Sequence, residues 1–257
     1  MSRLAKLLSH YNEGTSIGKV LRAPFRFVPS GSALPVLFGI NKGLKWIVGS
    51  SARQCWLGTY EAEKQSIIQS LVKPGMTVFD VGANAGFFSI GFSRLVGFSG
   101  EIWAFEPLAN QVDFLLKHLK LNKLENVQVI QSALADKSGF VRFEVCSNGF
   151  MGSLGGNSHY HVPVASIDEL IISGTVPIPN VIKLDVEGAE ASVLRGARQC
   201  LKNDRPLLLI ACHGKEQRQQ CLELLQSNKY QIYYLDGGKH EGSQLLDDEI
   251  YALPEDC

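Results

Sequence analysis

The sequence has no apolar run of the roughly 18 residues that a membrane-spanning helix needs. Its start, MSRLAKLLSHYNEG, meets charged and polar residues before an apolar stretch of signal-peptide length builds up. We therefore expect a cytoplasmic protein without a leader or a membrane span. At 257 residues, with 45% hydrophobic and 19% charged residues, the chain can bury one large core.

The sequence also lacks a net charge, because 25 Lys and Arg residues balance 25 Asp and Glu residues. No global field attracts nucleic acid, so we expect no nucleic-acid partner. The charges are nevertheless unevenly spread, since the start of the chain is basic and the end acidic. We predict that residues 1–50 form a basic segment, helical or irregular, outside a main domain of residues 51–257. This segment packs on the domain, binds an anionic acceptor, or makes peripheral membrane contact.

Paired cysteines are missing as well, because the six cysteines are scattered and form no Cys-x-x-Cys motif. Such spacing indicates reduced thiols rather than disulfides. His159 and His161 lie two apart, yet no Cys or carboxylate stands at ligand spacing beside them. We therefore expect no metal site.

Apolar runs typical of buried strands recur along the chain, and amphipathic patterns typical of helices separate several of them. One such pattern, 109–123, has Val112, Leu115, Leu116 and Leu119 at helical spacing. Alternating strands and helices predict an α/β fold with a mostly parallel central sheet and helices on both faces. The predicted strands cover residues 77–81, 101–105, 127–131, 181–186, 207–212 and 231–235.

A glycine-rich stretch at 146–160 lies between two weaker strand candidates, 139–145 and 161–167. Glycines at this density are typical of a segment that must bend or move. The stretch is therefore either an exposed connection or a mobile lid, and the sequence leaves both open.

The first predicted strand leads into a loop of small residues within VFDVGANAGFFSI, residues 78–90. In open α/β sheets, ligands bind at the carboxyl ends of the strands, where such a loop enters a helix. Gly82 and Gly86 would let the backbone approach a ligand, and Asp80 could accept loop amides or bind a cationic group. Glu106, about 20 residues beyond the loop, is placed to bind both hydroxyls of a ribose. The pattern predicts a nucleoside site.

The G-x-G-x-x-G fingerprint of dinucleotide sites is absent, because Asn84 and Phe87 stand where the second and third glycines would fall. A ligand without a pyrophosphate tolerates Asn84, and an acid at Asp80 suits a ligand that carries an amino group. The spacing therefore favours S-adenosylmethionine over a nicotinamide dinucleotide.

The largest set of related motifs comprises GTYEAE at 58–63, FDVGANAGFFSI at 79–90, AFEP at 104–107, SALAD at 132–136, VASIDEL at 164–170 and VIKLDVEGAEASVLRGA at 181–197. With these motifs the chain resembles the FkbM family of S-adenosylmethionine-dependent methyltransferases. One departure is Ala211, where the family often has an acid before the histidine that is His213 here. The resemblance implies a Rossmann-like class I methyltransferase fold. It also implies O-methylation of a hydroxyl on a sugar, glycan, glycolipid or natural product.

In the fold that the resemblance implies, the first strand is central, with strands two and three on one side and four and five on the other. His213 and Asp185 then end strands on the acceptor side. His213 suits a general base because its ordinary pKa of about 6.5 leaves it neutral at cytoplasmic pH. Asp185 is the rival base, or binds the amino end of the cofactor, or orients His213. The expected cofactor-binding residues are Glu61, Asp80, Gly82, Ala83, Asn84, Gly86, Glu106, Pro107, Ser132, Ala133, Leu134 and Asp185.

Several of these side chains also have plain structural interpretations. Glu190 suits a helix start, where the helix dipole favours an acid. Phe87 and Phe88 suit the core, and one of them could instead line the cofactor pocket. Tyr60 and Glu61 precede the first strand and could contact the methionine portion of the cofactor.

Two other functions remain open at this point. A non-catalytic nucleoside-binding module would bind the cofactor without transferring a methyl group, and a nucleotide-dependent oxidoreductase would prefer NAD. Methylation of nucleic-acid bases is disfavoured because the chain has no Asn-Pro-Pro-Tyr stretch and no overall basic charge. The acceptor and the oligomeric state are left undetermined by the sequence.

Overall fold

The computed structural model describes residues 28–145, 152–154, 161–245 and 247–255. Its centre is a seven-stranded sheet with the order β12-β13-β11-β10-β3-β4-β5. The predicted α/β fold is confirmed, and so is the placement of the first predicted strand between the second and the fourth. The parallel strands are β3 (Thr77–Val81), β4 (Glu101–Phe105), β5 (Val127–Ile130), β10 (Val181–Leu184) and β11 (Leu207–Ala211).

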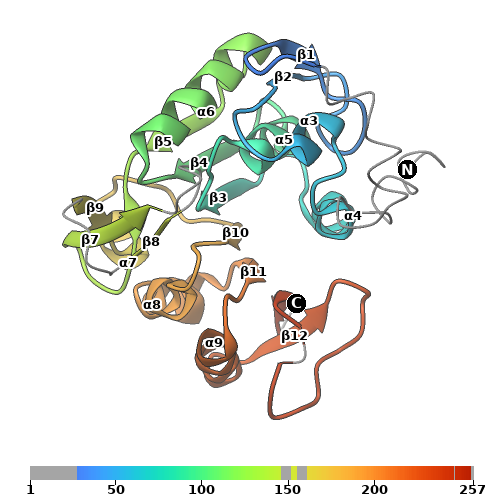
Figure 1. Cartoon of the computed structure of the whole chain (residues 1–257). Coiled ribbons are helices and arrows are strands. Elements are labelled where there is room, and N and C mark those ends of the chain that lie inside the picture. Colours follow the sequence, from blue (N-terminus) through green and yellow to red (C-terminus); the bar gives the residue numbers. More distant parts are fainter. Residues whose placement is uncertain (1–27, 146–151, 155–160, 246, 256–257) are drawn as a thin grey trace.

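The parallel strands are nearly continuous apolar runs, because helices cover both faces of the sheet. Successive residues of β3 serve opposite faces: Val78 packs in one core cluster and Phe79 in the other. Figure 1 shows α4 and α8 on opposite sides of the sheet. One core cluster includes residues of α4 (Ala62–Leu71), α5 (Phe87–Val96) and α6 (Ala109–Asn122), and the other includes residues of α7 (Ile167–Ile172), α8 (Glu190–Arg195) and α9 (Lys215–Ser227).

Helix α6 shows how far the apolar spacing determines burial. Val112, Leu115 and Leu119 are buried, as the periodicity predicts. Leu116 is half exposed, because a residue one position after Leu115 lies about 100° further round the helix. The buried stripe is therefore narrower than the apolar pattern predicted.

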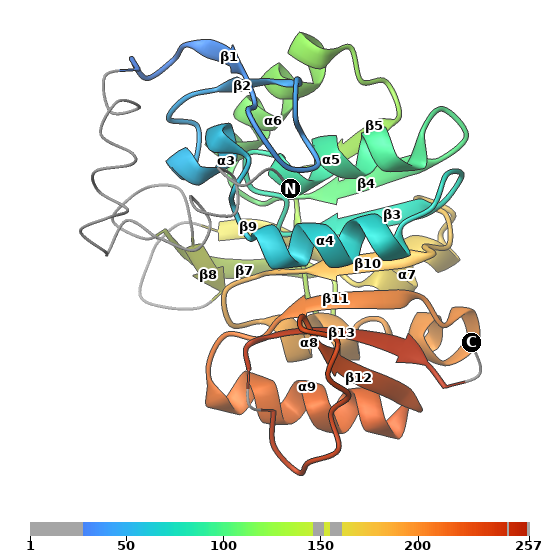
Figure 2. The same ribbon diagram turned by 90° about the vertical axis from the view of Figure 1, so that its right-hand side faces the viewer.

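The edge of the sheet holds a strand that we did not predict. β13 (Glu249–Pro254) lies antiparallel between β11 and β12 (Tyr230–Tyr234), which brings the end of the chain into the sheet (Figure 2). Every second side chain of β13 is buried, but its sequence, EIYALP, does not alternate strictly between polar and apolar residues. Pairing on both sides, rather than the pattern of its own residues, makes this segment a strand.

A second, four-stranded sheet has the order β6-β9-β7-β8. It contains both weaker strand candidates, which are confirmed as β7 (Gly139–Val145) and β9 (His161–Ala165), together with β6 (Ala133–Leu134) and β8 (Gly152–Leu154). β8 pairs antiparallel with β7. Apart from β8, the stretch 146–160 lies outside the described residues, so the lid remains a prediction.

The described part of the basic N-terminal segment packs on the main domain. It forms the hairpin β1 (Ala33–Pro35) and β2 (Lys45–Ile47), and α3 (Arg53–Leu57) follows. Trp46 is fully buried, and its ring stacks on that of His118 in α6 with centroids 3.9 Å apart. The domain boundary after residue 50 stays a prediction, and residues 1–27, with the predicted short helix, lie outside the described part.

His118 joins this hairpin to the loop that follows β3. Its Nε2 accepts the backbone N–H of Ile47 at 3.0 Å, which leaves Nδ1 to donate to the carbonyl of Ala85 at 2.8 Å. Burial lowers the pKa of His118 to about 4, so the ring stays neutral and keeps both hydrogen bonds. One buried imidazole thus connects three segments of the chain.

Two further findings concern the helices and the cysteines. Over the described ranges, no helix is long and apolar enough to cross a membrane. The cysteines that the structure describes, Cys55, Cys200, Cys212 and Cys221, are buried and free.

Candidate active site

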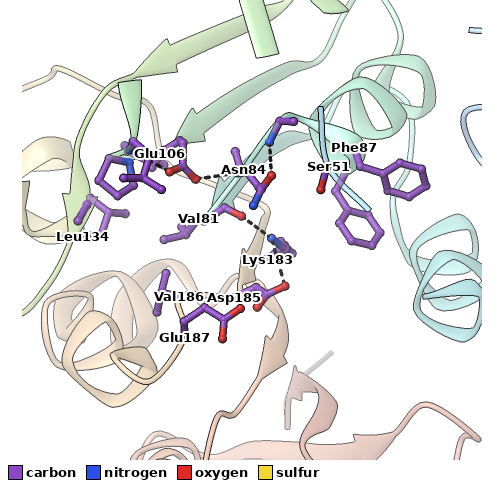
Figure 3. Close-up of a pocket in the computed structure, with 18 of the residues that line it drawn as sticks. Ser51, Val81, Asn84, Phe87, Glu106, Leu134, Lys183, Asp185, Val186 and Glu187 are labelled. Carbon is purple, nitrogen blue, oxygen red and sulfur yellow. Dashed lines mark hydrogen bonds and ion pairs between the residues drawn. The ribbon is translucent and has the colours of Figure 1, made fainter. Parts of the chain in front are cut away.

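A cavity of about 350 Å³ lies at the carboxyl ends of β3, β4, β5 and β10 (Figure 3). This is the edge of an open α/β sheet at which ligands bind. Most of the predicted cofactor-binding residues line it: Gly82, Ala83, Asn84, Glu106, Pro107, Ser132, Ala133, Leu134 and Asp185. Glu61, Asp80, Gly86 and His213 are described by the structure but do not line the cavity wall.

The glycines of the loop after β3 are required by contacts within the protein. Gly82 has a φ of 75°, and a Cβ there would lie 1.8 Å from the carbonyl oxygen of Asp185. Gly86 has a φ of 88°, and a Cβ there would lie 2.2 Å from a methyl group of Leu115. We predicted these glycines from close approach to a ligand. The structure adds close approach to the residue after β10 and to α6, with backbone angles that favour glycine, and close approach to a ligand stays a prediction.

Glu106 fastens the loop after β3 to the end of β4. Its carboxylate accepts the backbone N–H of Asn84 at 2.8 Å and that of Leu108 at 2.9 Å. The side chain is 5% exposed, and this burial raises its pKa to about 7 although both hydrogen bonds lower it. The buried carboxylate at the cavity wall is therefore pre-positioned, with room to accept further donors.

Lys183 was not singled out by the sequence analysis, yet it lies at the centre of the polar network (Figure 3). Its Nζ donates to the carbonyl of Gly82 at 2.9 Å, and lies 3.1 Å from Asp80 and 3.8 Å from Asp185. Burial lowers its pKa, but the neighbouring carboxylates outweigh that effect and the pKa is raised. A lysine inside a strand pattern reads as an interruption of the apolar run, so only the fold identifies this role.

Asp80 is buried behind the cavity wall. It accepts a hydrogen bond from the hydroxyl of Ser89 at 2.6 Å and pairs with Lys183, and its side chain is fully buried. We predicted that Asp80 accepts loop amides or binds a cationic ligand group. In the structure it holds Lys183 and the start of α5, and direct contact with a cofactor stays a prediction.

Tyr60 and Glu61 are neighbours in the sequence, but only one of them lines the cavity. Tyr60 lines the cavity, whereas Glu61 pairs with Lys64 at 2.5 Å at the start of α4. Lys64 also pairs with Glu249 of β13 at 2.8 Å, and its side chain is only 2% exposed. Glu61 therefore serves a buried ion-pair network beside the cavity, and its contact with a cofactor stays a prediction.

At the other end of the cavity, three side chains meet after β10 and β11. The Nε2 atom of His213 lies 3.7 Å from Oδ1 of Asp185 and 3.6 Å from Oε2 of Glu187. Asp185 and Glu187 line the cavity, and Figure 3 shows them side by side below Lys183. The topology thus brings together the two predicted catalytic residues, and adds Glu187.

His213 is held from its other side by Glu190, the first residue of α8. Its Nδ1 lies 2.8 Å from Oε1 of Glu190, whose side chain is fully buried. This hydrogen bond, with the charges of Asp185 and Glu187, raises the pKa of His213 to about 9. We interpreted Glu190 as a helix-dipole acid; it does begin a helix, but its carboxylate also binds the ring of His213.

Other lining residues carry no sequence signal of their own. The N-terminal segment supplies Trp46, the connection before α3 supplies Ser51, and α3 supplies Cys55. Phe87 and Phe88 belong to the core, as predicted, and also line the cavity. Single aromatic or small residues far apart in the sequence cannot be assigned to one pocket before the fold is known.

Comparison with known proteins identifies the family of these motifs. The family model described as the methyltransferase FkbM domain matches residues 80–233. The hexuronic acid methyltransferase AglP of Haloferax volcanii is 30% identical over 146 residues, which cover 54% of this chain and 59% of that protein. A ribosomal protein L11 methyltransferase of Caldanaerobacter subterraneus is 37% identical over 79 residues, or 30% of this chain and 25% of that protein. The chain thus spans less than two thirds of each relative.

Solved structures agree on the fold. A methyltransferase FkbM from Methylobacillus flagellatus superimposes with a TM-score of 0.51 at 18% identity, over 79% of this chain and 55% of that one. An S-adenosylmethionine-dependent O-methyltransferase from Thermotoga maritima gives a TM-score of 0.50 at 16% identity, over 91% and 81%. At such identities the likeness concerns the fold alone, and it confirms the predicted Rossmann-like class I arrangement.

Proposed function

From the premise that this chain belongs to the FkbM methyltransferase family, we propose that it binds S-adenosylmethionine and methylates a hydroxyl group of a sugar. One observation carries the proposal. A single cavity has the buried carboxylate of Glu106 at one end and Asp185 and Glu187 at the other, and His213 lies beside these two acids behind the cavity wall. A nucleoside and an acceptor can therefore bind at opposite ends of one cavity.

The nucleoside end suits the cofactor of the family. Glu106 already accepts two backbone N–H groups and retains lone pairs for the ribose hydroxyls. Ser132, Ala133 and Leu134 line the same end, where they would contact the adenine ring. The glycines of the loop after β3 are explained by protein contacts and therefore carry no argument for a pyrophosphate. The alternative of a nucleotide-dependent oxidoreductase is disfavoured by the missing G-x-G-x-x-G fingerprint.

The acceptor end supplies groups that can position a hydroxyl and receive its proton. In the transfer, the acceptor oxygen bonds to the methyl carbon while the carbon–sulfur bond breaks and its electron pair stays on sulfur. The hydroxyl proton leaves to a base, and the enzyme holds the acceptor oxygen about 3 Å from the methyl carbon. Asp185 and His213 remain the two candidates for the base, with Glu187 beside them. The pKa of about 9 contradicts the expectation that His213 is neutral, because the ring then stays protonated at neutral pH and must lose that proton before it can act as a base, whereas Asp185 is already ionised.

A sugar acceptor is supported by the relative from Haloferax volcanii, which is named for methylation of a hexuronic acid. That similarity extends over 146 residues, more than half of this chain. The match to a ribosomal protein L11 methyltransferase is shorter, at 79 residues, and carries no argument for the acceptor. A glycan or glycolipid that carries such a sugar remains within the proposal, and a non-catalytic nucleoside-binding module is the second candidate.

Transfer of labelled methyl from S-adenosylmethionine to a panel of sugars tests the proposal. The panel should pair each uronic acid with its neutral parent sugar, and product analysis should locate the new methyl group on oxygen. Label on a sugar hydroxyl supports the proposal. Cofactor binding without transfer to any sugar, glycan or glycolipid would favour the non-catalytic module, and preferential binding of NAD would favour the oxidoreductase.

A further inference from the structure

The side chains at the acceptor end have the geometry of a metal site. Asp185, Glu187 and His213 each offer one ligand atom, and the three atoms lie within 4.8 Å of one another. Ligands bound about 2.1 Å from one cation lie about 3 to 4 Å apart, and the two distances from His213 Nε2, 3.7 and 3.6 Å, fall in this range. A small closure of the carboxylates would let all three bind one ion.

Glu190 provides an independent indication. Its carboxylate is fully buried and faces the cluster, with Oε1 on His213 Nδ1, while Oε2 has no hydrogen-bond partner among the residues the structure describes. A carboxylate behind a histidine holds the ring so that its other nitrogen points at the metal. With Nδ1 donating to Glu190, Nε2 faces Asp185 and Glu187, and it can bind a cation when its proton leaves.

The local charge also favours a cation. Asp185, Glu187 and Glu190 surround one imidazole, and Lys183 approaches Asp185 only to 3.8 Å because it is bound to Asp80 and Gly82. Lys64 is likewise engaged by Glu61 and Glu249. Three carboxylates that are buried or half-buried around one imidazole need a metal ion or further cationic groups to balance their charge.

We propose that Asp185, Glu187 and His213 bind one divalent cation, with Glu190 as the group that positions His213. Two carboxylates and one imidazole suit Mn²⁺, and Mg²⁺ less well because it prefers oxygen ligands and keeps its waters. We expected no metal site because no Cys or carboxylate stands at ligand spacing beside His159 and His161. Asp185 and His213 belong to different strand ends and form no sequence motif. The fold brings them to adjacent strand ends.

Three protein ligands leave coordination positions open, and these face the cavity because Asp185 and Glu187 line it. The cation could therefore bind two neighbouring oxygens of the acceptor. It would also neutralise the carboxylates that otherwise repel an acidic sugar. This last step rests on the proposed function, whereas the metal site stands on the geometry alone.

Electron paramagnetic resonance of Mn²⁺ added to the metal-stripped full chain tests the site. We expect one Mn²⁺ per chain at about pH 8, where ligands are more readily deprotonated. Glu187→Gln and His213→Ala should each weaken binding at least about tenfold, and Glu190→Gln should weaken it about 10- to 100-fold through the orientation of His213. Thermal unfolding of each variant shows whether the fold is kept.

Glu216→Gln is the matched control, because Glu216 is an exposed acid on α9 that is not among the three candidate ligands. It should bind Mn²⁺ as the unmodified chain does. Equal affinity of the unmodified chain and a folded Glu187→Gln, His213→Ala double variant would overturn the site. Methyl transfer without Mn²⁺ binding would leave the proposed function intact, and Mn²⁺ binding without transfer would leave the site intact.

Discussion

At the scale of single residues, buried ionisable groups perform structural work that their sequence context does not reveal. His118 accepts a hydrogen bond from one segment and donates to another, and Glu106 accepts from two. The hydrogen bonds of both residues require the unprotonated side chain, because a proton added to His118 Nε2 or to the Glu106 carboxylate removes an acceptor. Each therefore gives a measurable dependence on pH.

His118→Phe should keep the stacking on Trp46 and lose both hydrogen bonds. The part-buried N–H of Ile47 and the buried carbonyl of Ala85 would be left unpaired, so we expect a loss of about 2 to 4 kcal/mol in unfolding free energy. Urea denaturation measures the change. Lys120→Phe is the control, because Lys120 is an exposed residue of the same helix, α6. Its unfolding free energy should stay close to that of the unmodified chain.

His118 also predicts how stability changes with pH. Its folded pKa of about 4 lies below the ordinary value of 6.5, so the unfolded chain binds the proton more tightly. The stability that it contributes is fully present above about pH 6.5 and is lost as the pH falls toward 4, by up to about 3 kcal/mol. The difference between the unmodified chain and His118→Phe, followed by urea denaturation across this range, should shrink at acid pH. A difference independent of pH would contradict a neutral, buried ring.

Glu106 predicts a pH dependence of cofactor binding. Ribose hydroxyls would donate to the ionised carboxylate, whose pKa in the free protein is about 7. Affinity for S-adenosylmethionine should therefore rise as the pH increases toward 7, by up to about tenfold per pH unit, and then level off. Calorimetric titration from about pH 5.5 to 7.5 measures it. A slope that persists in Glu106→Gln would assign the effect to another group.

Glu106→Gln should also weaken binding of S-adenosylmethionine by about 1.5 to 3 kcal/mol, because hydrogen bonds to a charged acceptor are lost. Glu125→Gln is the matched control, since Glu125 is an exposed acid on the loop before β5. It should bind the cofactor normally. Unchanged affinity in a folded Glu106→Gln protein would place the ribose elsewhere.

At the scale of elements, the parallel strands were predictable because each is a short, buried apolar run, the pattern typical of a strand covered on both faces. The edge strand β13 was not, since its pairing with β11 and β12 makes it a strand. The site followed the same division. Residues at strand ends were predicted by type and spacing, whereas Lys183 and Glu190 acquire their roles only when separate strands are brought together.

The pairing of β3 with β10 predicts the importance of Lys183, which stands opposite Asp80 in the register. Lys183→Met should destabilise the fold by about 3 to 5 kcal/mol, because the buried charge of Asp80 loses its partner. The double variant Lys183→Met, Asp80→Asn should recover part of this loss. Thermal and urea unfolding measure both, and a double variant no more stable than the single one would show that Asp80 is not the source of the loss.

At the scale of the whole molecule, the N-terminal segment is only partly separate. Residues 28–50 contribute Val36, Ile40, Trp46 and Val48 to the core that holds α5, and Trp46 also lines the cavity. The composition of this segment predicts a basic surface, but it does not predict which of its side chains are buried. A truncation at residue 50 would therefore expose core, and tests of the basic region should retain residue 28 onward.

The membrane hypothesis concerns residues 1–27 in particular. If their basic residues bind anionic lipid, the full chain should sediment with anionic vesicles at low salt and be released at high salt. A chain starting at Val28 should stay in the supernatant. Both chains in the supernatant at low salt would contradict peripheral membrane contact through this segment.

The central claim is that one cavity joins a cofactor end to an acceptor end. Its most direct test is transfer of labelled methyl from S-adenosylmethionine to a uronic-acid sugar by the unmodified chain and by His213→Ala, with cofactor affinity measured on both. The account predicts labelled O-methyl sugar from the unmodified chain. For His213→Ala it predicts nearly normal cofactor affinity and a rate at least about 100-fold lower. Equal rates in the two proteins, or cofactor affinity lost together with the histidine, would contradict it.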